Sequence, residues 1–130
     1  MGNRGPKPGA SLSTPIDLST IEELADGDPA AMAELTAMFR RHTGEQIAQA
    51  RAAIAARQRW EVARVAHTCI GFTSALGLIS VVPILRELER AARLERSERA
   101  TFAKLVLLVK KWEAEFERLE TALKQRIGAP

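Results

Sequence analysis

The residue of this chain best suited to chemistry is His67, because a neutral imidazole offers a nucleophilic nitrogen near neutral pH. His67 lies in the middle of a segment whose apolar residues recur at helical spacing. They form one stripe of that helix: Val62, Val65, Ala66, Cys69, Phe72, Thr73 and Leu76. Since His67 points roughly opposite the centre of this stripe, we expect its ring to be exposed on rigid backbone and available to another macromolecule.

The helical wheel also predicts which side chains surround His67. Those within about 60° of it are Trp60, Ala63, Ser74 and Leu78. Those on its flanks are Gly71, Arg64 and Ile70. An apolar ring around a polar centre favours a docking patch for a partner, for which we select Trp60, Ala63 and Leu78.

The presence of Gly71 inside the predicted helix requires an explanation, because glycine lowers the stability of a helix by about 1 kcal/mol relative to alanine. Close packing against a neighbouring helix is one explanation. Because Gly71 lies on the outward side of the wheel, we favour the other, in which the missing side chain lets a partner's backbone or a phosphoryl group approach the ring.

Helical periodicity extends through most of the chain and predicts a short helix followed by four longer ones. The expected ranges are about 19–26, 28–57, 58–76, 80–94 and 97–128. The expected end signals are a capping box of Ser19 with Glu22, the pair Asp28 and Pro29, the caps Ser80 and Ser97, and Gly77. No segment alternates with period two for long enough to predict a strand.

Four amphipathic helices with short connections predict an all-α, antiparallel four-helix bundle with a short additional N-terminal helix. Residues 1–15 contain three prolines and three glycines without apolar periodicity, which is typical of a flexible basic tail. We therefore expect a tail over 1–15 and one bundle domain over 16–128.

Composition narrows the class of function. The chain has 130 residues, a net charge of +3 and one cysteine, which favour a single domain in the cytoplasm, expected to be monomeric. We expect neither a membrane span nor a secretory signal, and no motif favours nucleic acid. There is no glycine-rich phosphate loop, so ATP binding by that route and kinase-like autophosphorylation are excluded.

Three other candidates have simpler interpretations. His42 falls near Leu35 and Phe39, so a packed histidine is expected there. Cys69 faces the predicted core, where a thiol acts as a small hydrophobic group. Because His67 and Cys69 diverge on the wheel, the sequence predicts no metal site.

The segment Ala66-His67-Thr-Cys-Ile-Gly71-Phe-Thr-Ser-Ala-Leu-Gly77 resembles the signature of histidine-containing phosphotransfer (HPt) domains. In that family an Ala-His pair precedes Leu-Lys-Gly, a stretch of small residues and a second glycine. Residues 85–93 also resemble the family's Leu-Glu…Ala-Arg pattern on the next helix, and the similarity covers about residues 16–123.

The resemblance implies a phosphocarrier of a two-component phosphorelay, and not an enzyme with catalytic machinery of its own. His67 would shuttle a phosphoryl group between receiver-domain aspartates. The implied partners are response-regulator receiver domains and a hybrid histidine kinase. The chain would need no cofactor, because the receiver would bring the metal ion.

The chain departs from the family pattern at two positions, with Cys69 in place of the leucine and Ile70 in place of the lysine. That lysine helps to neutralise the phosphoryl oxygens. Arg64 could reach forward to replace it, or Ile70 could extend the docking patch and restrict the choice of partner. In the remaining alternative phosphotransfer is lost, and the chain is a docking module that binds a receiver or kinase domain.

Overall fold

The computed structural model describes residues 15–94 and 98–128, and these residues are almost entirely helical. The elements are α2 (Ser19–Ala25), α3 (Pro29–Ala55), α4 (Arg59–Ala75), the 3₁₀ helix η1 (Ile79–Val81), α5 (Val82–Arg93) and α6 (Glu98–Ile127). No strand occurs among the described residues. The expected all-α class is therefore confirmed.

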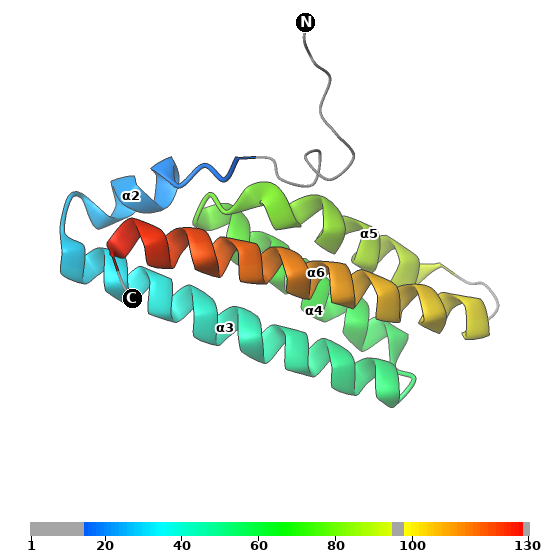
Figure 1. The fold of residues 1–130 in the computed structure, drawn as a ribbon. Helices are drawn as coiled ribbons and strands as arrows, with labels where there is room; N and C mark the ends of the chain where they lie inside the picture. Colours follow the sequence, from blue (N-terminus) through cyan, green and yellow to red (C-terminus); the bar gives the residue numbers. More distant parts are fainter. Residues whose placement is uncertain (1–14, 95–97, 129–130) are drawn as a thin grey trace, which may run out of the picture.

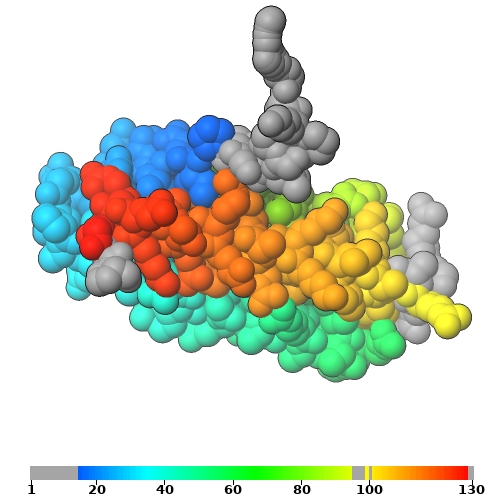
Figure 2. All heavy atoms as spheres, in the orientation of Figure 1, coloured from blue at the N-terminus to red at the C-terminus, as the bar shows by residue number. Residues whose placement is uncertain are grey.

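The long helices α3, α4, α5 and α6 run in alternating directions and lie side by side (Figure 1). Each packs on the next, and α6 packs back on α3, so that α4 and α5 are antiparallel neighbours. The short helix α2 lies beside the end of α6 (Figure 2), where Arg126 pairs with Glu22. The site helix α4 thus forms one wall of a helical bundle.

The predicted apolar stripe of α4 faces the core. Val62, Val65, Ala66, Cys69 and Thr73 are fully buried, Leu76 is 5% exposed, and Phe72 packs partly buried against the core. Across the bundle they join a core with large side chains from the other helices, including Phe39, Leu85, Leu88, Leu105 and Trp112. Because one face of α4 is fixed by this packing, the direction of its opposite face is fixed as well.

The structure confirms the predicted N-terminal cap of one helix and corrects two others, although α2 does begin at Ser19 as predicted. Asp28 caps α3 by accepting a hydrogen bond from the backbone N–H of Ala30 at 2.9 Å. The predicted capping box at Ser19 is wrong: Ser19 is already helical, and Asp17 accepts from its N–H at 2.9 Å. The predicted cap at Ser80 is also wrong, because Ser80 lies inside η1 and α5 begins only at Val82.

Gly77 ends the site helix as predicted. Its φ of +74° lies in the left-handed region, a backbone conformation that residues other than glycine rarely adopt. A Cβ at this position would lie 2.3 Å from the Cβ of Thr20, so α2 approaches the end of α4 closely. The predicted cap Ser97 and nearly all of the predicted tail lie outside the described residues.

Candidate functional site

His67 presents its ring on the outer wall of α4. Its side chain is 73% exposed, although Ala63 and Ala66 of the same helix are fully buried. The prediction of an exposed imidazole on rigid backbone is confirmed. The ring is therefore accessible to a macromolecule approaching from solvent.

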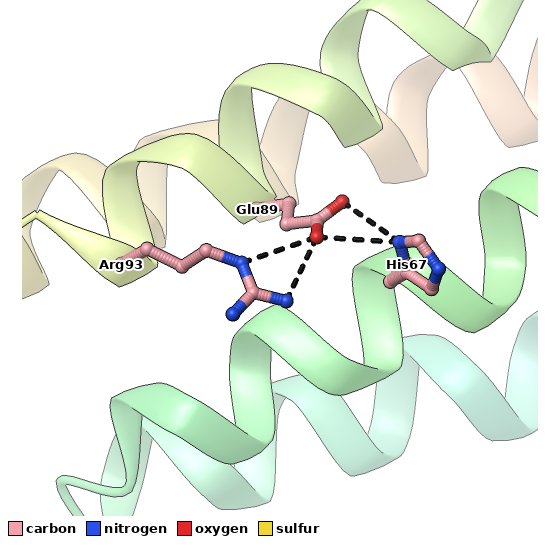
Figure 3. Close-up of polar contacts among 3 residues, drawn as sticks. All are labelled: His67, Glu89 and Arg93. Carbon is pink, nitrogen blue, oxygen red and sulfur yellow. Dashed lines mark hydrogen bonds and ion pairs between the residues drawn. The ribbon is translucent and has the colours of Figure 1, made fainter.

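A carboxylate from the neighbouring helix holds one nitrogen of this ring. Nδ1 of His67 lies 3.3 Å from both oxygens of Glu89 on α5. One of these oxygens also accepts hydrogen bonds from Nη2 of Arg93 at 2.9 Å and from Nε at 3.1 Å. Figure 3 shows the three side chains in a row, with Nε2 of His67 on the side away from Glu89.

The charge of Glu89 determines which ring nitrogen is free. Partial burial opposes ionisation of Glu89, but hydrogen bonds from Arg93 and His67 outweigh it and lower the pKa of the carboxyl group. An ionised carboxylate can only accept hydrogen bonds, so Nδ1 of His67 must carry the proton that it shares with Glu89. In the neutral ring this leaves the lone pair on Nε2, the nitrogen on the side away from Glu89.

Open space lies at Gly71, one turn along α4 from His67. A Cβ at Gly71 would meet no atom within 4 Å, so close helix packing does not explain this glycine. The expectation that Gly71 provides access therefore fits the structure. Ser74, one turn further along α4, is also exposed.

Arg64 and Trp60 are exposed on the same wall. Arg64 donates two hydrogen bonds back to Glu61, at 2.9 and 2.6 Å, and is thus engaged away from His67. Trp60 is 55% exposed, and the guanidinium groups of Arg59 and Arg93 lie 5.3 and 5.9 Å from its ring centre. An exposed tryptophan therefore extends the surface beyond His67.

Two residues selected for the docking patch are buried. Ala63 is 0% exposed and Leu78 is 1% exposed, so their assignment to the exposed patch is wrong. Ala63 belongs to the buried core, and Leu78 comes after the end of α4 and packs into the same core. Ile70 is partly buried against the core as well, so its apolar side chain is explained by packing.

The other histidine and the cysteine are packed, as the sequence predicts. The centre of the His42 ring lies 4.1 Å from the centre of the Phe72 ring. Cys69 is fully buried, and this burial raises the pKa of its thiol to about 12. In the described ranges there is no group of three or more residues suited to bind a metal ion, and none of the helices is long and apolar enough to cross a membrane.

Sequence reasoning assigned no site role to Glu89 or Arg93. Both belong to the Leu-Glu…Ala-Arg pattern, and their spacing of four residues predicts an ion pair within one helix. That pair is a signal that can be read from the sequence. What the sequence does not reveal is that α5 places Glu89 against His67.

Comparison with known protein families gives one match: the family model described as Hpt domain matches residues 34–126. The matched range includes His67, Glu89 and Arg93. Searches of curated proteins and of solved structures found no match to this chain.

Proposed function

Because this chain belongs to the Hpt domain family, whose members are phosphocarrier modules of two-component phosphorelays, we propose that His67 is its phosphoacceptor. The observation that carries the proposal is the geometry of the ring: Nδ1 is held by Glu89, and Nε2 lies on the side away from Glu89 in a side chain that is 73% exposed (Figure 3). His67 then receives a phosphoryl group from one receiver-domain aspartate and passes it to another.

The transfer step requires no external base, because no proton has to be removed from His67 when it attacks. The lone pair on Nε2 attacks the phosphorus of an aspartyl phosphate in line, the P–N bond forms, and the P–O bond to the aspartate breaks. The aspartate leaves as a carboxylate. His67 keeps the proton on Nδ1, so the phosphorylated ring carries a positive charge that the Glu89 carboxylate stabilises.

The partner supplies what this chain lacks. We place the aspartate and its metal ion on the receiver domain, and we expect a hybrid histidine kinase upstream. Trp60 is the exposed apolar residue nearest in sequence to His67 on this wall, and it is retained in the docking surface. The chain's own contribution is a positioned nucleophile and a complementary surface, so it is a carrier and not an enzyme.

Incubation with phosphorylated receiver domains tests the proposal. We expect acid-labile label on the wild-type chain, appearing as the label on the receiver declines. If a broad panel of receivers binds the chain but none transfers label to it, the chain is the docking module that the absence of a lysine at position 70 favours. That result would overturn the proposed function.

Glu89→Gln tests the role of the carboxylate. Glutamine keeps an acceptor oxygen but cannot stabilise a positive ring by charge. Since hydrogen bonds to charged groups contribute about 1.5–3 kcal/mol, we expect transfer to slow by roughly ten- to hundredfold, measured as the rate of label transfer. The matched control is Glu87→Gln on the same helix, whose carboxylate pairs instead with Lys104 on α6 at 2.8 Å. Equal rates for the two variants would contradict this role.

Gly71→Ala tests whether this glycine provides access to the His67 ring at the expense of helix stability. Because a Cβ at Gly71 meets nothing within 4 Å, alanine should stabilise the helix by about 0.5–1 kcal/mol in urea unfolding. The added methyl group narrows the approach to the His67 ring, and we expect transfer to slow by roughly tenfold.

Gly44→Ala is the control for Gly71→Ala, since Gly44 lies inside α3 and a Cβ there also meets nothing within 4 Å. It should give the same gain in stability with an unchanged transfer rate. A Gly71→Ala variant that transfers as fast as Gly44→Ala would show that this glycine does not provide access.

A further inference from the structure

The wall formed by α4 and α5 carries several exposed arginines, and most of them are already held by a carboxylate. These pairs are Arg64 with Glu61 at 2.6 Å, Arg90 with Glu87 at 2.6 Å and Arg93 with Glu89 at 2.9 Å. Arg86 on α5 is also exposed, but within the described part of the chain it has neither an ion pair nor a hydrogen bond from its side chain. Its guanidinium is therefore available to an anion.

The helical register predicts that Arg86 lies about one turn of α5 from the contact between His67 and Glu89. Arg86 precedes Glu89 by three residues, so both lie on the edge of α5 that faces α4. The contact between His67 and Glu89 aligns the two antiparallel helices. Because the helices are antiparallel, the residue three positions before Glu89 on α5 lies at the same height along the bundle as the residue three positions after His67 on α4. Arg86, near the N-terminal end of α5, is therefore expected opposite Ile70 and Gly71 on α4. We therefore expect the guanidinium of Arg86 to reach the space left open at Gly71, which lies one turn along α4 from His67.

A phosphoryl group at this position needs a cation. It brings a charge of about −1.5 to −2 to a wall where Glu89 is already ionised. The guanidinium of Arg93 is occupied by Glu89, and that of Arg64 is occupied by Glu61. We propose that Arg86 is the phosphoryl-binding residue of this domain, and that its guanidinium crosses the space at Gly71 to bind the oxygens of the group on Nε2. This inference rests on the proposed function of His67.

Phosphoramidate is a suitable probe because it requires no partner protein. Nε2 of His67 attacks its phosphorus, the P–N bond of phosphoramidate breaks, and the nitrogen leaves as ammonia after taking a proton from water. The product is observed by ³¹P NMR. The position of its signal depends on the last ionisation of the phosphoryl group, and a nearby guanidinium favours the ionised form.

We expect Arg86→Ala to be phosphorylated roughly tenfold more slowly than the wild type. In the same variant the midpoint of the ³¹P titration should rise by roughly 0.5 pH unit or more. Arg86→Lys keeps a positive charge and should recover most of the shift in midpoint. The matched control is Arg90→Ala, because Arg90 lies on the same helix and pairs with Glu87; it should behave like the wild type.

The outcomes separate this inference from the proposed function. If the wild type is labelled at His67 and Arg86→Ala matches Arg90→Ala in rate and midpoint, the assignment of Arg86 is overturned and the function of His67 stands. If the wild type takes up no label that His67→Gln removes, the proposed function fails and this inference fails with it. A slower rate and a raised midpoint confined to Arg86→Ala support the assignment.

Discussion

His67→Gln is expected to abolish acid-labile phosphorylation of this chain by a phosphorylated receiver domain. Glutamine has no nucleophilic nitrogen, so no P–N bond can form at position 67. The side chain of His67 is 73% exposed, and its replacement should change the free energy of unfolding by no more than about 0.5 kcal/mol. The measurements are the amount of label on the purified variant and its urea unfolding curve.

The matched control for this variant is His42→Gln, since His42 is the other histidine of the chain. His42 packs against Phe72, and its replacement should leave labelling intact even if stability falls. Label that survives in His67→Gln but is lost in His42→Gln would show that His42, and not His67, is the phosphoacceptor.

Trp112→Ala is expected to cause the largest loss of stability, about 3–5 kcal/mol. Trp112 is the largest of the fully buried side chains and lies on α6 in the centre of the bundle. Its removal leaves a cavity that the surrounding helices cannot fill completely. Chemical denaturation monitored by circular dichroism measures the loss.

Trp60→Ala is the control for this loss, because Trp60 is the second tryptophan and is 55% exposed. It should alter stability by no more than about 0.5 kcal/mol while weakening the binding of a receiver domain. Similar losses of stability for the two variants would contradict the placement of Trp112 in the core.

The fold could be predicted from the sequence because its signals are local. Apolar spacing determines which face of each helix is buried, and Asp28 with Pro29 and Gly77 mark helix ends through backbone chemistry at single positions. The prediction fails at Ser80, because a cap also depends on the backbone conformation of the next residues. Ser80 resembles a cap, but the chain makes a 3₁₀ turn before α5 begins.

The site could be predicted only in part, because a single-helix wheel does not show where the neighbouring helix packs. It correctly predicted that His67 and Gly71 are exposed, since the exposure of these positions depends mainly on which face of α4 is buried. Ala63 lies on the same outer half of the wheel as His67 but is fully buried in the bundle. Glu89 was missed for the same reason: its contact with His67 joins residues 22 positions apart on two helices.

The most direct test of this account is to locate the phosphoryl group in the phosphorylated protein. NMR of the chain with ¹⁵N-labelled histidine, coupled to ³¹P, identifies both the residue and the ring nitrogen that carry it. The account predicts a bond to Nε2 of His67, because Nδ1 is held by Glu89. A phosphoryl group on Nδ1 of His67, or on any other residue, would contradict it.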